Sequence, residues 1–343
     1  MKRAIVCMDV TKRTDNQRKQ RPAVFAFFVS FAVGLTTFLL SQSTNAAEST
    51  PASTASGEGF GFDEQENQIH ISLNGKPIVD FVFRDDKTPR PYFANARLVN
   101  GLQVTRNHPP IEGVDAIDHA TMHPGIWLAF GDINGQDFWR NKAAMKHLRF
   151  ASAPKVADER LTFATECRLM TSDGQSLGLM ANDFTLTARP HGWLLVWSAE
   201  FRADQQPIIF GDQEEMGFGA RVATPFTEKN GGLIRSSTGK QTAKQTWGQT
   251  ANWCDYSGAG PQSGGIMLMA SPNNFRKSWW HNRNYGFFAA NPFGRKAMKQ
   301  GEVSSVSIAP GNSMRITFGA LIHDDHNLDH DAEFDTFKQL ISN

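Results

Sequence analysis

The sequence predicts an all-β fold, a large β-sandwich with few short helices. From residue 68 onward apolar and polar residues alternate with a period of two, and short apolar runs recur along the rest of the chain. Turns rich in Gly, Pro and Asn separate these runs, for example at residues 172–174, 189–192 and 310–312. Many short strands joined by such turns are typical of a β-sandwich or barrel. Because we find no internal repeat and no second linker, we expect one folded domain over residues 67–343.

The residues before this domain have the pattern of a targeting segment. Basic residues precede an uncharged apolar stretch at 23–40, and small residues follow it. This pattern predicts a signal peptide over residues 1–46, cleaved after Ala46. The stretch also reaches the length of a membrane-spanning helix, so an uncleaved N-terminal anchor is the alternative. In both cases we expect an exported domain, periplasmic or secreted, whose membrane contact is limited to this segment. Residues 47–66 read as a flexible linker.

The first strands of the domain form a predicted hairpin. Alternating segments at 69–73 and 78–83 flank Asn74-Gly75, a dipeptide that favours two-residue hairpin turns. The segment 193–201 is apolar enough for a strand that is buried on both faces. Further strands are expected at 161–168, 184–188, 208–210, 218–222, 265–269, 285–290, 304–308 and 314–322. Helices are expected only at 138–147 and 331–341.

Charge and cysteine content limit the classes of partner. The chain has 35 Lys and Arg residues against 34 Asp and Glu residues, and because seven of the basic but only two of the acidic residues precede Pro22, the rest of the chain is mildly acidic. Without a strongly basic domain, we expect no nucleic-acid partner. A neutral ligand rich in hydroxyl groups is the better expectation. Cys167 and Cys254 lie in the domain, where they form a disulfide or are two small buried core residues.

Aromatic and polar residues gather in four clusters that are typical of a carbohydrate site. Flat rings pack against the C–H faces of sugars, while amides, guanidinium groups and carboxylates bind hydroxyls. The alternative is that these rings fill the core of a large sandwich. Motifs of serine hydrolases, zinc proteases and phosphate-binding loops are absent from the sequence.

The first cluster, residues 118–139, contains His119, His123 and Trp127. Two histidines beside carboxylates supply a general acid, ligate a metal, or are hydrogen-bonded in a turn. Pro124 and Gly125 argue against a helix, so the helical geometry of zinc sites is not expected here.

The second cluster, residues 212–221, places Glu214 and Glu215 before Arg221. One carboxylate near the arginine is a candidate general base, or half of a surface ion pair. Adjacent residues of a regular strand face opposite ways, so we do not expect both glutamates to face the site.

The third and fourth clusters lie in the last third of the chain. Residues 253–258 and 271–294 contain too many Asn and Pro residues for the interior of a strand, and we expect a loop that lines a pocket. Residues 321–330 include His323 and form either a metal site or a polar turn before the last helix. A divalent metal held by His119, His123 and His323 is therefore an alternative; otherwise no cofactor is expected.

Five blocks of this sequence resemble a bacterial family called PmoA-like, or DUF6807. They are Arg90-Pro-Tyr92 and residues 118–139, 214–221, 253–258 and 280–294, in the family's order and over most of residues 75–323. The histidine block has one extra residue, and Pro124 stands where Arg is common. Glu214-Glu215-Met216 replaces the usual Lys-Glu-Gly, which leaves Glu215 as the matching carboxylate. A methane-oxidising membrane subunit, which the family name suggests, is excluded because the chain has only one long apolar stretch.

The resemblance implies a fold similar to galactose mutarotases, enzymes that use a histidine acid and a carboxylate base over a bound sugar. By that analogy His119 or His123 is the acid and Glu215 the base. We therefore expect an exported carbohydrate-active enzyme, with epimerisation, elimination and hydrolysis all open, or else a glycan-binding module without catalysis. The expected substrate-binding residues are Arg90, Tyr92, Trp127, Arg221, Tyr256, His281, Arg283, Tyr285, Asn291 and His323.

Overall fold

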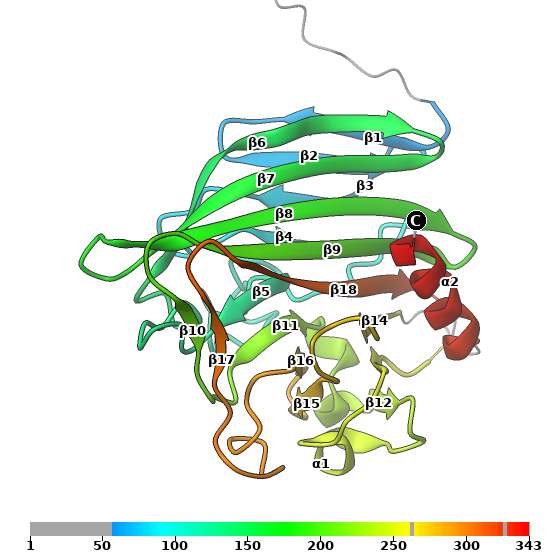
Figure 1. Ribbon diagram of the computed structural model, residues 1–343. Coiled ribbons are helices and arrows are strands. Elements are labelled where there is room, and N and C mark those ends of the chain that lie inside the picture. Colours follow the sequence, from blue (N-terminus) through cyan, green and yellow to red (C-terminus); the bar gives the residue numbers. More distant parts are fainter. Residues whose placement is uncertain (1–56, 261–263, 325–327, 343) are drawn as a thin grey trace, which may run out of the picture. The chain divides into compact units, whose positions relative to one another are not determined.

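A computed structural model describes residues 57–260, 264–324 and 328–342 (Figure 1). The expected signal peptide or anchor at 1–46 and the linker as far as residue 56 lie outside the described residues. Within the described part of the chain, no helix is both long and apolar enough to cross a membrane.

Two eight-stranded antiparallel sheets form the sandwich. The first sheet has the order β1-β2-β3-β4-β5-β11-β16-β15, and the second has the order β12-β13-β14-β18-β9-β8-β7-β6. The strands of the first sheet are β1 (Phe60–Glu64), β2 (Gln68–Leu73), β3 (Lys76–Val82), β4 (Tyr92–Ala94), β5 (Ile126–Phe130), β11 (Met216–Arg221), β16 (Phe287–Asn291) and β15 (Trp279–Asn282). Those of the second are β12 (Leu233–Ser236), β13 (Trp253–Ser257), β14 (Gly265–Ala270), β18 (Ser313–His323), β9 (Gly192–Ala203), β8 (Ser176–Arg189), β7 (Arg160–Met170) and β6 (Ala144–Ala157).

Few other elements complete the described fold. Strands β10 (Ile208–Phe210) and β17 (Val306–Ile308) pair separately from the two sheets. Helix α1 (Thr242–Thr246) is a short turn, and α2 (His330–Ser342) packs at the C-terminal end. The predicted helix at 331–341 is thereby confirmed, and so is the all-β fold class with few short helices.

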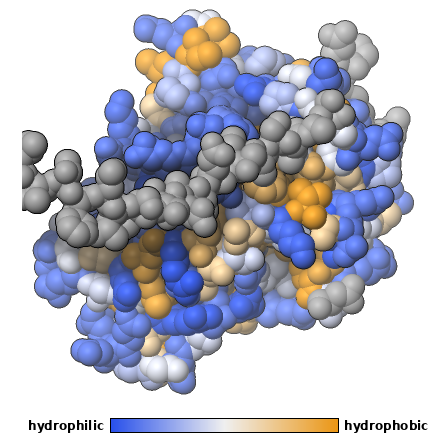
Figure 2. All heavy atoms as spheres, turned by 90° about the horizontal axis from the view of Figure 1, so that it is seen from above, coloured by the Kyte–Doolittle hydropathy of each residue, from blue (hydrophilic) through white to orange (hydrophobic). Residues whose placement is uncertain are grey.

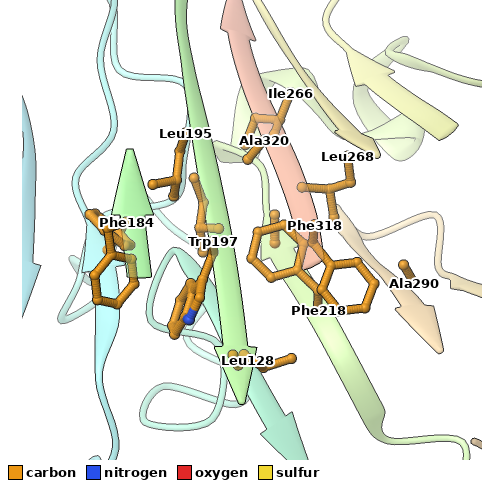
Figure 3. Close-up of a cluster of buried hydrophobic side chains, with 14 of the residues drawn as sticks. Leu128, Phe184, Leu195, Trp197, Phe218, Ile266, Leu268, Ala290, Phe318 and Ala320 are labelled. Carbon is orange, nitrogen blue, oxygen red and sulfur yellow. The ribbon is translucent and has the colours of Figure 1, made fainter. Parts of the chain in front are cut away.

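The core lies between the two sheets, as Figure 3 shows. Phe218 of β11 stacks on Phe318 of β18 with ring centroids 5.2 Å apart. Trp197 of β9 meets the edge of Phe218 at 5.9 Å, and Phe184 of β8 lies 4.8 Å from Phe81 of β3. These rings come from alternate positions of facing strands, which is how two sheets bury one common core.

The predicted first hairpin is confirmed. Strands β2 and β3 pair around Asn74 and Gly75, whose φ angles are 52° and 70°. Two consecutive positive φ angles are the requirement of a type I′ turn, and Asn-Gly meets that requirement at little steric cost. The strand predicted at 193–201 lies within β9, and Trp193–Trp197 is buried along its whole length.

Three sequence predictions are wrong. Residues 138–147 form a turn, in which Asn141 has a φ of 61°, followed by the start of β6 rather than a helix. The linker expected at 47–66 includes β1, which pairs with β2 and belongs to the first sheet. The loop expected in the third cluster is partly strand, because residues 253–257 form β13, residues 279–282 form β15 and residues 287–291 form β16. Polar side chains fit inside β13 because hydrogen bonds satisfy them there, as between Asp255 and His323.

The two domain cysteines are free and buried. Cys167 lies on β7 and Cys254 on β13, and burial raises the pKa of both thiols. Of the two alternatives, the structure therefore supports small core residues.

Edge strand β6 carries an exposed row of charge. Lys146, Arg149 and Lys155 are exposed along it, which discourages pairing with another chain. Figure 2, which looks down on this part of the molecule, shows a mostly hydrophilic surface with small, scattered hydrophobic groups.

The outer face of the first sheet positions the candidate site. Trp127 of β5 and Phe287 of β16 point away from the core, yet both are buried. Met122 and Trp139, from the segments before and after β5, pack over them. Loops rather than helices thus cover this face, and the pocket lies within them.

Candidate functional site

A pocket of about 180 Å³ lies on the outer face of the first sheet; we call it the site pocket. Six of the residues expected at the site line it. The lining consists of His119, Met122, His123, Trp139, Arg140, Glu215, His281, Arg283, Tyr285 and Phe287.

Stacked rings form one side of the site pocket. The ring of His123 lies parallel to Phe287 and Trp127, with centroids 4.7 and 5.0 Å away, and His119 stacks on His123 at 4.8 Å. Trp127 is fully buried beneath His123, so it supports the pocket rather than lining it. Glycine is required beside it at Gly219 of β11, where a Cβ atom would lie 3.0 Å from Trp127 Cζ2.

Asp118 orients His119. Its carboxylate accepts two hydrogen bonds from Arg221, at 2.8 and 3.0 Å, and lies 2.7 Å from His119 Nδ1. Burial alone would raise the pKa of Asp118, but the bonds from Arg221 and His119 lower that pKa to about 2. An ionised carboxylate only accepts, so His119 Nδ1 carries a proton and donates it. Nε2 of this half-exposed ring is then the nitrogen available for proton exchange.

His123 is a neutral hydrogen-bond donor. Its Nδ1 lies 3.3 Å from a guanidinium nitrogen of Arg221, which can only donate, so the ring proton is on Nε2. Burial, and then the charges of Arg221 and His119, hold the pKa of His123 well below its usual range. A neutral imidazole N–H can polarise a ligand oxygen without releasing its proton.

Glu215 lines the site pocket, whereas Glu214 lies outside its lining. Glu215 Oε2 lies 2.8 Å from Arg140 Nη2 in the site pocket, and Glu214 Oε2 lies 2.7 Å from Arg283 Nη2. Only one of the two glutamates lines the site pocket, as expected, although both precede β11, so the alternation of a regular strand is not the reason. Glu214 was one of two candidates for the general base, and no role was predicted for Arg140.

His281 of β15 is held neutral beside Glu214. Its Nδ1 donates to the backbone carbonyl of Glu214 at 3.0 Å. Burial, and then the charge of Arg283, lower the pKa of His281 to about 3. Its Nε2 lies 3.3 Å from Glu214 Oε2 and has no hydrogen-bond partner among the described residues. Since the ring of His281 is neutral, its contact with the Glu214 carboxylate is not an ion pair.

Three residues expected to bind substrate instead hold the loops in place. The buried guanidinium of Arg90 donates to the backbone carbonyls of Phe138, Trp139 and Met122. Arg221 is buried behind Asp118. Asn291 donates to the carbonyls of Gln213 and Glu214. All three are positioning residues, because each acts on the site through another group.

Three further expected residues lie outside the site pocket. Tyr92 donates its hydroxyl to Asp85 at 2.7 Å in a separate cavity of about 810 Å³. Tyr256 is buried in β13, where its hydroxyl accepts from the backbone N–H of Glu228 at 2.7 Å. His323 belongs to β18 of the second sheet.

His323, the third ligand of the expected alternative metal site, lies in a different sheet from the pocket of His119 and His123. His323 Nε2 lies 2.8 Å from Asp255 of β13, in the second sheet, whereas His119 and His123 line a pocket on the first. Across residues 57–260, 264–324 and 328–342, no three His, Cys, Asp or Glu side chains are grouped to hold a metal ion.

Arg106 is the positioning residue that sequence analysis missed. Its buried guanidinium donates to four backbone carbonyls, those of Ala116, Asp118, His119 and His123. No motif marks this arginine, because its partners are backbone atoms that any sequence provides.

Comparison with solved structures finds sugar-processing proteins at low sequence identity. A galactose 1-epimerase from Lactobacillus acidophilus NCFM has a TM-score of 0.43 and 8% identity, over 79% of this chain and 100% of that chain. A galactose mutarotase-like protein from Clostridium acetobutylicum has a TM-score of 0.36 and 8% identity, over 78% of this chain and 95% of that chain. A beta-arabinopyranosidase has a TM-score of 0.33 and 10% identity, over 77% of this chain and 38% of that chain.

No curated protein matches the sequence. The family of unknown function DUF6807 matches residues 68–334, which include every described strand from β2 to β18. The chain therefore belongs to the DUF6807 family.

Proposed function

We propose that this protein is an exported carbohydrate-active enzyme that performs acid–base chemistry on a neutral sugar in the site pocket. One observation carries the proposal. A histidine oriented by an ionised aspartate, His119, lines the same pocket as the carboxylate of Glu215. Two groups that can each give or take a proton in one small cavity are what proton transfer to and from a ligand requires.

The charges in and behind the site pocket favour an uncharged ligand. The two arginines that line the site pocket and Arg221 behind it each have an anionic partner within 3.0 Å: Arg140 with Glu215, Arg283 with Glu214, and Arg221 with Asp118. An anionic ligand would have to displace a carboxylate. Hydroxyl groups can join these pairs without breaking them, since they both donate and accept.

The chemistry can be assigned atom by atom. His119 Nε2 takes a proton from one ligand oxygen or gives a proton to it, while Asp118 stabilises the imidazolium that forms. His123 donates its Nε2 hydrogen to an oxygen on which negative charge develops. Glu215 transfers a proton in the opposite direction to His119, at a second position of the ligand. The rings of Tyr285 and Phe287 contact the C–H face of the sugar.

Assays on a sugar panel test the proposal. Free hexoses and pentoses, their aryl glycosides and short oligosaccharides are incubated with the protein, and NMR and mass spectrometry detect anomer exchange, elimination and hydrolysis. We expect turnover of at least one class, and a loss of at least about 100-fold in His119→Gln and in Glu215→Gln.

The control is Glu166→Gln on β7, a glutamate that pairs with Arg149 at the same 2.8 Å distance but lies outside the site pocket. It is expected to keep full activity. Unchanged activity in both site variants, or glycan binding with no conversion of any panel member, would refute an enzyme with this site.

Export is tested separately. N-terminal sequencing of the protein recovered from its native cells should begin at Ala47, as cleavage after Ala46 requires. A membrane-bound protein that retains residues 1–46 would instead indicate the anchor.

A further inference from the structure

A second pocket, of about 350 Å³, lies between α1 and the end of β15; we call it the α1 pocket. It shares one residue, Arg283, with the site pocket. The other residues that matter here are Trp247, directly after α1, and Asn282, the last residue of β15. The two pockets therefore meet at a single side chain.

Trp247 supplies a flat ring to the α1 pocket. The residue is half-buried, and its indole N–H is buried without a hydrogen-bond partner among the described residues. Buried indole N–H groups normally find an acceptor, so this one, like that of Trp127, lacks its usual partner among the described residues.

Asn282 has a matching unpaired acceptor. Its amide nitrogen donates to Thr246 Oγ1 at 2.7 Å, which fixes the side chain, whereas its Oδ1 is buried and has no partner within the described residues. The lining residues thus carry one unpaired donor and one unpaired acceptor beside an aromatic ring. Sugar hydroxyls both donate and accept, and the C–H face of a sugar packs on an indole.

Arg283 lies at the boundary of the two pockets. Its Nη2 is 2.7 Å from Glu214 Oε2, and its Cζ is 6.0 Å from the ring centre of Trp247, which Lys299 Nζ also approaches, at 5.5 Å. A guanidinium with several donors can contact two neighbouring sugar units at once.

We propose that the α1 pocket is a second sugar subsite, so that the ligand of this protein is at least a disaccharide. One unit occupies the site pocket and the next stacks on Trp247, with Arg283 between them. This inference rests on the proposed function, because it assumes that the site pocket binds a sugar.

Calorimetric titration with monosaccharides and with the di- to tetrasaccharides built from them tests the inference. The variants are Trp247→Ala, Trp247→Phe and, as an exposed aromatic outside both pockets, Phe275→Ala. We expect Trp247→Ala to weaken oligosaccharide binding about 10-fold and to leave monosaccharide binding within about twofold, while Trp247→Phe keeps most of the affinity. Phe275→Ala is expected to change neither.

The outcomes separate the subsite from the enzyme proposal. Oligosaccharides that bind no tighter than monosaccharides, or a Trp247→Ala variant that loses both equally, overturn the subsite even where monosaccharide turnover persists. Trp247-dependent oligosaccharide binding without turnover supports the subsite and contradicts only the enzyme proposal. No binding by any member of the panel overturns the subsite.

Discussion

Replacing Asp118 by Asn tests the organisation of the site most directly. The substitution keeps the shape of the side chain but removes the charge that faces Arg221 and His119. An amide can still accept one hydrogen bond from Arg221, but it can offer its NH₂ group to His119 Nδ1 and so favour the wrong tautomer. We expect two effects, a modest loss of stability and a large loss of turnover.

The stability effect follows from the pKa of Asp118. The difference between the ordinary value of 3.8 and the value of about 2 in the folded protein corresponds to about 2.4 kcal/mol. Because 40% of the Asp118 side chain is exposed, solvent screening reduces this figure, and we expect about 1 kcal/mol at pH 7. The folded pKa is lowered, so this stabilisation is present above about pH 4 and is lost as the pH falls toward 2.

Urea denaturation of the wild type and Asp118→Asn at pH 7 and at pH 3 measures the stability effect, and the difference should be smaller at pH 3. Asp183→Asn is the matched control, since Asp183 also pairs with an arginine at 2.8 Å but is more exposed. Turnover should fall about 100-fold or more in Asp118→Asn alone. If Asp118→Asn costs the same stability in an Arg221→Met background as in the wild type, the two groups are not coupled and the reasoning fails.

Three further predictions concern buried groups. Gly219→Ala should destabilise the protein by about 1–3 kcal/mol in urea denaturation, because its Cβ atom would lie 3.0 Å from Trp127 Cζ2; an unchanged midpoint would mean that the ring moves freely. His281, with a pKa of about 3 against an ordinary 6.5, stays neutral while the unfolded chain takes up a proton, so stability should fall by about 2 kcal/mol between pH 7 and pH 5 on its account. Denaturation of His281→Gln at both pH values should lack that part of the fall. Cys167 and Cys254 should react with a thiol reagent only after denaturation, and reaction of the folded protein would contradict their burial.

Local patterns predicted most of the sandwich. Period-two alternation and the Asn74-Gly75 turn are local signals that specify a hairpin without reference to the rest of the chain, and β2 and β3 followed them. The prediction of a helix at 138–147 was wrong because the apolar residues of this segment are buried on two different sides of the first sheet. Trp139 packs on the outer face of the first sheet, whereas Met145 is buried in the core between the sheets. A one-dimensional pattern does not separate two faces that only the tertiary fold creates.

The residues that line the candidate site were predicted only in part. His119 and His123 came from a motif dense in ionisable groups, Glu215 was chosen over Glu214 by the family resemblance, and all three line the site pocket. Arg90 and Asn291 came from equally dense motifs and proved to be bound to backbone carbonyls. The same donors that would recognise sugar hydroxyls also recognise carbonyl oxygens, so residue type alone cannot distinguish a ligand contact from a backbone contact.

Buried arginines explain how irregular loops can hold a defined pocket on the face of a sheet. A loop that covers a sheet leaves carbonyl oxygens without the partners that helices and strands provide, and these must be satisfied when buried. Arg106 satisfies two such carbonyl oxygens beside the site pocket, because it donates to those of His119 and His123 at 3.2 Å. The stacking distance of 4.8 Å between the two imidazole rings is therefore set partly by a side chain that bonds to the backbone of both residues. The geometry of the site pocket thus depends on a guanidinium outside its lining, and a change at Arg106 should disturb turnover and stability together.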